Sequence, residues 1–286
     1  MSTTSYDCSN DDQRAEGLAH AQKAIAAKQV IVMPTDTVYG IAADAFSPQA
    51  VATLLAAKGR GRNMPPPVLI PRIGTMEGLA TDIPDDARKL AEKYWPGPLT
   101  LIFHAQPSLT WDLGETHGTV ALRVPDDQLA LDLLTLTGPL AVSSANRTGQ
   151  LAAQSVEEAR EQLAESVEVY LDGGFRPADF TYAVPSTIVD ATGLRLRVVR
   201  EGAISFEEIK RMIPSVLGAD AEPEMWSPAT ESPAAAEPAE EVPAADEPAA
   251  TEPAATEPAA EAPAQPESEQ DVPAEPIQDA VPGQTT

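Results

Sequence analysis

A cationic cluster, KGRGRN, follows a helix-like segment that ends near residue 58. Its charged side chains are those of Lys58, Arg60 and Arg62. Arginine can bind two phosphate oxygens through parallel N–H donors, and lysine adds a compact positive charge. The same charges would also stabilise the C-terminal end of their own helix through its dipole. The cluster therefore indicates a polyphosphate site, with a purely structural role as the alternative.

A further arginine, Arg123, lies within an otherwise apolar run, TVALRVPDD. A guanidinium in the interior needs a counter-charge, because an unpaired buried charge is costly. An internal Asp or Glu would supply that charge, and so would the carboxylate of a bound ligand. The sequence leaves both alternatives open.

Three other segments are rich in hydroxyl and amide side chains. They are PTDTVYG with Thr35, Thr37 and Tyr39, AVSSANRTG with Ser143, Ser144 and Asn146, and PSTIVD with Ser186 and Thr187. Each could bind a nucleotide or only satisfy the backbone of its own turn. Taken singly, each segment is a weak signal.

Several well-known site motifs are absent from the sequence. It has neither the glycine-rich phosphate loop of nucleoside triphosphatases nor the dinucleotide-binding fingerprint. His20, His104 and His117 show no ligand spacing, and Cys8 is the only cysteine. We therefore expect no protein metal site, no organic cofactor and no internal disulfide. An enzyme of this kind would act mainly by positioning and charge.

The elements that would position these groups alternate along the first 214 residues. Capped segments predict helices over about 10–28, 47–58, 84–95, 126–136, 155–163 and 205–212. Short apolar runs predict strands over 30–33, 38–43, 68–70, 99–103, 119–124, 140–143, 167–171, 186–190 and 194–200. This interleaving favours one α/β domain with a mixed sheet.

Charge divides the chain into two parts. Residues 219–286 hold 17 of the 44 acidic residues and none of the 19 basic ones, whereas the first 218 residues have a net charge of −8. Prolines recur every five residues from Pro223 to Pro263. Because such a segment has little apolar surface to bury, we predict a disordered acidic Pro/Ala/Glu-rich tail. It is either a spacer or docking tail, or an extension without a specific role.

The sequence also bears on location. Its first residues lack a basic region followed by an apolar run, and no stretch approaches 18 consecutive apolar residues. A secretory signal and a transmembrane helix are therefore not expected. We expect a soluble cytoplasmic protein without a membrane partner.

Six motifs in a fixed order resemble those of the YrdC-like threonylcarbamoyl-adenylate synthases. They are PTDTVYGIAADA, AAKGR, TVALRVPD, SSANRTG, PSTIVD and VVREG, and the resemblance covers about residues 11–214. It implies a twisted mixed sheet with surrounding helices and a large, positively lined cavity. It also implies a nucleotidyltransferase that condenses L-threonine, bicarbonate and ATP into threonylcarbamoyl-AMP and pyrophosphate, with Mg²⁺ expected beside ATP. Other proteins would then transfer the threonylcarbamoyl group to tRNA.

The resemblance also implies roles for individual residues. Thr37, Arg123 and Ser186 would contact L-threonine, with Arg123 at its carboxylate. Contacts to ATP would come from Lys58, Arg60, Thr119, Ser144, Asn146 and Arg200. Lys58 and Arg60, the family's K-x-R, would be the catalytic pair because they would meet the phosphates.

The chain departs from the family pattern in two places. Many relatives follow K-x-R with P-x-x-N-P-L and a histidine, whereas here Met64 takes the asparagine place and Leu69 the histidine place. Longer relatives carry a second C-terminal domain where this chain has its acidic tail. We therefore expect a flexible N-terminus over 1–10, a catalytic domain over 11–214 and the tail over 219–286.

Three rival functions remain open from the sequence. The first is a double-stranded RNA-binding or ribosome-assembly module of the same fold, with tRNA or double-stranded RNA as partner, although the net charge of −8 opposes unaided binding. The second is carbamoyl transfer, but the related chains carry zinc-finger-like cysteines. The third is an interaction protein acting through its tail, which deletion of the residues after Ala219 would separate from an enzyme.

Overall fold

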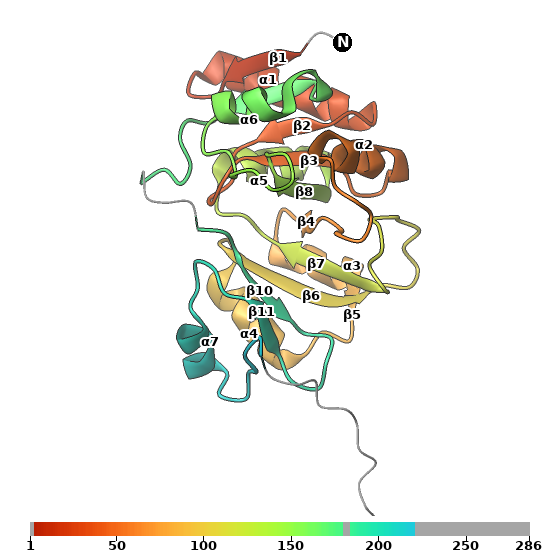
Figure 1. Ribbon diagram of the computed structural model, residues 1–286, viewed down its shortest axis with the longest axis vertical. Coiled ribbons are helices and arrows are strands. Elements are labelled where there is room, and N and C mark those ends of the chain that lie inside the picture. The colour runs from red at the N-terminus through yellow and green to blue at the C-terminus, as the bar shows by residue number, and fades with distance from the viewer. Residues whose placement is uncertain (1–2, 180–183, 221–286) are drawn as a thin grey trace, which may run out of the picture. The chain divides into compact units, whose positions relative to one another are not determined.

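A single sheet of mixed strand direction carries the fold. The computed structural model describes residues 3–179 and 184–220, and within these ranges eleven strands join into one twisted sheet (Figure 1). Its order is β1-β9-β2-β3-β8-β4-β7-β6-β10-β11, with β5 paired to β6. The strand bounds are Thr4–Asp7 (β1), Ile31–Met33 (β2), Gly40–Asp44 (β3), Val68–Leu69 (β4), Ala80–Thr81 (β5), Leu99–Ala105 (β6), Thr119–Arg123 (β7), Leu140–Ser144 (β8), Val169–Asp172 (β9), Thr187–Asp190 (β10) and Arg197–Arg200 (β11). The predicted α/β class with a mixed sheet is confirmed.

Helices cover the sheet in the described ranges. Their bounds are Asp11–Ala26 (α1), Pro48–Lys58 (α2), Met76–Leu79 (α3), Asp85–Tyr94 (α4), Gln128–Thr137 (α5), Val156–Leu163 (α6) and Phe206–Met212 (α7), with 3-10 turns at Ile73–Thr75 (η1) and Ala164–Ser166 (η2). In these same residues, every helix is too short or too polar to cross a membrane.

The α2 helix shows how local sequence fixes a functional loop. The side chain of Ser47 caps its first turn by accepting a hydrogen bond from the backbone N–H of Ala50, and Pro48 begins the helix. Gly59 ends it in the left-handed conformation, at φ 61°. The chain therefore leaves the helix directly into the cationic KGRGRN segment, as the sequence predicts.

Two apolar cores lie on the two faces of the sheet. Alternate residues of β2 belong to different cores. Val32 packs into the core that includes α2 and α6, whereas Ile31 and Met33 pack into the core that includes α1 and α5. Side chains alternate between the faces of a strand, so a strand covered on both faces is apolar throughout. This explains the short uninterrupted apolar runs in the sequence.

The N-terminus differs from the expectation. The sequence predicts a flexible segment over residues 1–10, but Thr4–Asp7 form β1, which pairs in parallel with β9 at one end of the sheet order. The strand has only four residues, and half of them are exposed, so it carries little apolar pattern to predict it. Its backbone pairing with β9 stabilises it instead. Apart from residues 219 and 220, the tail expected over 219–286 lies outside the described residues.

Candidate active site

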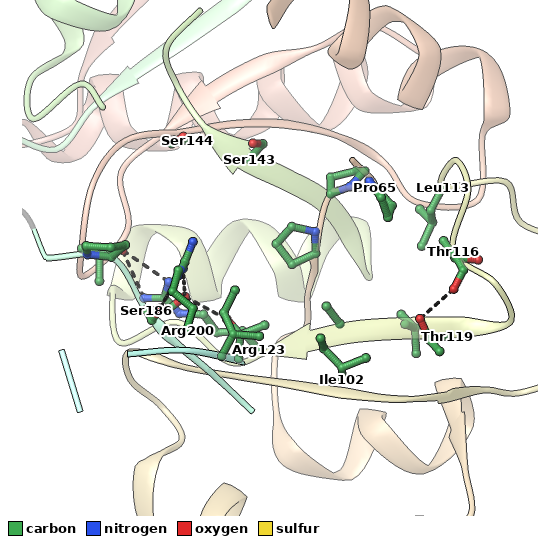
Figure 2. A pocket seen from close by; sticks show the side chains of 18 of the residues that line it. Pro65, Ile102, Leu113, Thr116, Thr119, Arg123, Ser143, Ser144, Ser186 and Arg200 are labelled. Atoms are coloured by element: carbon green, nitrogen blue, oxygen red, sulfur yellow. Dashed lines mark hydrogen bonds between the residues drawn. The ribbon is translucent and has the colours of Figure 1, made fainter. Parts of the chain in front are cut away.

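A cavity of about 460 Å³ is lined by residues from five strands, β6, β7, β8, β10 and β11, and from the loops beside them (Figure 2). Alternation along β6 and β7 creates its floor. In β6, Leu99 and Leu101 pack into the core, while Thr100 and Ile102 line the cavity. In β7, Arg123 lines it and its neighbour Leu122 is in the core. The apolar strands thus place selected polar side chains on one face of the sheet.

The charges that line the cavity are all positive. Arg60, Arg123 and Arg200 contribute the charged side chains, and none of the described residues that line the cavity is an Asp or a Glu. Arg60 comes from the loop after α2, Arg123 from β7 and Arg200 from β11. Residues distant in sequence therefore build one positively charged cavity, of a size that small molecules occupy.

Arg60 has an unused hydrogen-bond donor. Its Nη1 donates to the hydroxyl oxygen of Ser143 at 2.9 Å, whereas its buried Nε has no hydrogen-bond partner among the described residues. Burial lowers the pKa of the guanidinium. A buried donor without a partner is costly unless a ligand satisfies it, so the side chain suits a phosphate oxygen.

Arg123 has an internal acid as its partner. Its Nη2 lies 2.6 Å from Oδ1 of Asp36, and both side chains are largely buried. Its Nε donates to the carbonyl oxygen of Gly97 at 3.0 Å, and Nη1 and Nη2 each lie 3.3 Å from Oγ1 of Thr37. The first of the two alternatives for Arg123 thus holds in this structure, although the residue also lines the cavity.

The second guanidinium at this end of the cavity belongs to Arg200 (Figure 2). It donates to the carbonyl oxygen of Ser186 from Nη2 at 2.7 Å and to the Ser186 hydroxyl at 3.2 Å. Burial and then the nearby charge of Arg123 lower its pKa. Two like charges held this close favour an anion between them.

Hydroxyl groups complete the arginine end. Thr37 is buried in the turn before β3, and its Oγ1 lies 3.1 Å from that of Thr35. The Ser186 hydroxyl lies 2.9 Å from that of Thr100. Both Thr37 and Ser186 line the cavity beside the two arginines, so the three expected threonine contacts come together.

The expected nucleotide contacts divide into two groups. Arg60, Ser144, Thr119 and Arg200 line the cavity, and Thr119 also donates to the carbonyl oxygen of Thr116 at 2.8 Å. Lys58 and Asn146 are not among the lining residues. We therefore treat these two separately.

Lys58 points into a loop rather than into the cavity. Its Nζ donates to the carbonyl oxygens of Ser144 and Asn146, and its own carbonyl oxygen accepts from the backbone N–H of Thr148 at 2.9 Å. The side-chain amide of Asn146 donates to the carbonyl oxygens of Arg147 and Gln150 at 2.9 and 2.8 Å. Burial, and then the charge of Arg60, lower the pKa of Lys58 to about 8. In this structure both side chains organise the loop after β8.

Several lining residues were not singled out from the sequence. Thr100 sits in LTLIFHA, where the apolar neighbours hide it, and alternation within that run is the signal that could have revealed it. Pro65 and Leu113 line the other end of the cavity (Figure 2). At the two departures from the family pattern, Met64 is exposed and Leu69 is buried in the core beneath α5.

Comparison with known proteins identifies the family. The family model Sua5_yciO_yrdC, described as "Telomere recombination", matches residues 23–202. A Mycobacterium tuberculosis H37Rv protein named "Putative threonylcarbamoyl-AMP synthase" is 51% identical over 219 residues, which cover 77% of this chain and 97% of that protein. The threonylcarbamoyl-AMP synthase of Bacillus subtilis 168 is 34% identical, over 71% of this chain and 57% of that protein.

Solved structures of similar proteins have the same fold as this chain. The crystal structure of Pyrococcus abyssi Sua5 complexed with L-threonine matches with a TM-score of 0.66 and 32% identity, over 70% of this chain and 58% of that one. The chain thus spans less than two thirds of that longer protein. Escherichia coli YciO matches at a TM-score of 0.60 and 24% identity, which concerns the fold alone. Because the family model covers more than half of its residues and a relative is 51% identical over most of its length, the chain belongs to the Sua5/YciO/YrdC family.

Proposed function

We propose that this chain is a threonylcarbamoyl-AMP synthase. The observation that carries the proposal is the cavity in which Arg60, Arg123 and Arg200 meet the hydroxyl groups of Thr37 and Ser186. The names of the relatives at 51% and 34% identity support the same activity. A cavity with several positive charges suits a reaction in which two anions must be brought together.

The reaction proceeds in two steps. The amine of L-threonine attacks carbon dioxide, or bicarbonate with loss of water, and forms a C–N bond that gives N-carboxy-threonine. An oxygen of the new carboxylate then attacks the α-phosphorus of ATP, and the bond from that phosphorus to the bridging oxygen breaks. Threonylcarbamoyl-AMP and pyrophosphate are the products. The second step makes the protein a nucleotidyltransferase.

L-Threonine occupies the end of the cavity that holds Arg123 and Arg200. A guanidinium binds a carboxylate through parallel N–H donors, and Arg123 of β7 faces the cavity there. Thr37 and Ser186 supply hydroxyl groups that can donate to or accept from the substrate. The crystal structure of a relative with L-threonine supports an amino-acid site in this fold.

ATP occupies the part of the cavity lined by Arg60, Ser144 and Thr119. The unpaired Nε of Arg60 supports a contact to a phosphate oxygen. Lys58 and Asn146 act on the nucleotide side through the loop that follows Ser144. Arg200, at the end of the cavity that it shares with Arg123, stabilises the negative charge that develops as the two anions approach.

Mg²⁺ enters this proposal as part of the nucleotide substrate. The described residues contain no group of three or more His, Cys, Asp or Glu side chains able to hold a metal ion. The phosphates of ATP are themselves oxygen ligands that Mg²⁺ prefers.

The product serves tRNA modification in this proposal. Threonylcarbamoyl-AMP is an activated mixed anhydride, so a separate transfer protein takes the threonylcarbamoyl group to tRNA. A cytoplasmic location and a catalytic domain over residues 11–214, extended by β1, belong to the same proposal. An RNA-binding module is the alternative, with tRNA or double-stranded RNA as its ligand.

The test is pyrophosphate release from ATP by the full chain, with L-threonine and bicarbonate omitted in turn. Release that requires both small molecules supports the synthase. Release that is indifferent to L-threonine means another carboxylate substrate. No release, together with binding of double-stranded RNA, would favour the RNA-binding module.

A further inference from the structure

Asp36 lies directly behind the arginine end of the cavity. Its Oδ1 accepts a hydrogen bond from Nη2 of Arg123 at 2.6 Å and a second one from the backbone N–H of Asp126 at 3.1 Å. The Asp36 side chain is 13% exposed and the Arg123 side chain 8%. The ion pair is therefore removed from solvent, where its geometry is well defined and weakly screened.

Other donors of Arg123 make hydrogen bonds as well. Nε donates to the carbonyl oxygen of Gly97, and both Nη atoms approach Oγ1 of Thr37. The guanidinium is thus fixed from three sides, by the turn that holds Asp36 and Thr37, by the loop before β6 and by its own strand β7. Of these partners, Asp36 is the one that carries a compensating charge.

Asp36 itself does not line the cavity, whereas Arg123 and Thr37 do. A substrate in the cavity therefore meets Arg123 and Thr37, and Asp36 acts on it only through them. The ion pair fixes the plane of the guanidinium, which decides where its donors point. The negative charge of Asp36 also offsets one of the two positive charges that Arg123 and Arg200 place at this end of the cavity.

We propose that Asp36 is a positioning residue that orients Arg123, and with it Thr37, for binding the carboxylate of L-threonine. This inference rests on the proposed function, because it names the residue that prepares its amino-acid site. Without Asp36, the guanidinium of Arg123 is a buried charge with only neutral partners, and it can rotate towards other acceptors. Misplacing a binding group by about 1 Å can cost about 100-fold in rate.

The experiment compares four single variants and one double variant of the full chain in the pyrophosphate-release assay. Asp36→Ala removes the carboxylate, and Asp36→Asn retains an oxygen acceptor of the same shape. Asp126→Asn is the matched control, because Asp126 is an exposed neighbouring acid whose backbone N–H, rather than its side chain, contacts Asp36. Arg123→Gln provides the background for a double-variant test.

We expect the KM for L-threonine to rise about 10- to 100-fold in Asp36→Ala and less in Asp36→Asn, because the amide oxygen partly replaces the carboxylate. The KM for ATP should stay within about 2-fold, since Arg60 lies at the nucleotide side. Asp126→Asn should behave as the unmodified chain. In the Arg123→Gln background, adding Asp36→Asn should change the KM for L-threonine by less than about 2-fold, because both changes act through one contact.

Other results would overturn the inference. A purely structural role predicts a lower melting temperature with equal changes for both substrates, and additive effects in the Arg123→Gln background. If Asp36→Ala fails to fold, Asp36→Asn decides. If the unmodified chain is active and Asp36→Asn has the same KM for L-threonine as Asp126→Asn, the positioning role is rejected and the proposed function stands. If the unmodified chain shows no threonine-dependent release, the proposed function is rejected, and this inference with it.

Discussion

Nη1 of Arg60 donates a hydrogen bond to the hydroxyl oxygen of Ser143 at 2.9 Å, across 83 positions of the sequence. The contact joins the loop after α2 to the end of β8, so that Arg60 of the K-x-R motif and Ser144 of the S-x-N motif line the same cavity. It uses one terminal nitrogen of the guanidinium and leaves Nε without a partner among the described residues. A guanidinium that lines a cavity and has an unsatisfied donor is suited to an anionic ligand.

Replacing Arg60 should therefore abolish most of the activity. We expect Arg60→Gln to lower kcat/KM for pyrophosphate release at least about 100-fold, which corresponds to about 3 kcal/mol of transition-state stabilisation. The matched control is Arg62→Gln in the same loop. Arg62 is exposed and pairs with Asp112 at 2.7 Å, so its loss should change the rate less than about 2-fold. Equal losses in the two variants would contradict the assignment of Arg60.

Lys58 should contribute to loop structure and to pH-dependent stability. Its buried Nζ contacts the carbonyl oxygens of Ser144 and Asn146, so Lys58→Met should leave these acceptors unsatisfied and destabilise the fold by about 1–3 kcal/mol per acceptor. The KM for ATP should rise with it. The control is Lys89→Met: Lys89 is exposed in a surface ion pair, so this variant should keep nearly the melting temperature of the unmodified chain.

The pH dependence follows from the sign of the pKa change at Lys58. Because its folded-state pKa is lowered to about 8 from 10.5, the unfolded chain binds more protons between these values. The free energy of unfolding of the unmodified chain should therefore rise with pH from about 8 to about 10, relative to Lys58→Met, by a few kcal/mol in order of magnitude. Urea unfolding of both chains across this range measures the difference, and a gap that is constant with pH would refute the lowered pKa.

Gly114 holds the loop between β6 and β7 against the cationic loop. Its φ is +110°, and a Cβ atom there would lie 2.6 Å from the carbonyl oxygen of Arg62. Gly114→Ala should cost about 1–3 kcal/mol and raise the KM for ATP, because the neighbouring Leu113 lines the cavity. Gly78→Ala is the control, since a Cβ atom at Gly78 would have no described atom within 4 Å and the backbone there suits any residue. Similar melting temperatures for the two variants would count against this role.

The acidic tail should be dispensable for turnover. Among the residues that the structure describes, those that line the cavity lie between Thr37 and Arg200. A chain ending at residue 220 should therefore keep kcat and both KM values within about 2-fold. A loss of turnover, with the melting temperature unchanged, would favour a function that resides in the tail.

Much of the fold could be predicted because local signals and burial agree. The ends of α2 follow from Ser47 and Gly59, and the strands covered on both faces appear as apolar runs. By contrast, β1 and the two-residue β5 have too few residues for a pattern. Their stability comes from pairing with strands that are distant in sequence, which single segments do not reveal.

The sequence indicates which residues form the candidate site, but not which of their atoms contact one another. Arg123 is recognisable from the sequence as a buried charge, yet its partner Asp36 is 87 positions away and only the folded chain brings them together. Lys58 is a second example, because its acceptors are the carbonyl oxygens of Ser144 and Asn146, which follow it by 86 and 88 positions in the sequence. Residue type and order indicate a shared site, whereas the direction of each side chain depends on the packing of the sheet.

The most direct test of the account is to detect the product itself. The full chain would be incubated with ATP, L-threonine and bicarbonate labelled at carbon, and the nucleotide products separated. The account predicts label in a compound that also contains the AMP and threonine parts, formed in equal amount with pyrophosphate and absent when L-threonine is omitted. Pyrophosphate formed without labelled nucleotide, or no pyrophosphate at all from a folded chain, would contradict it.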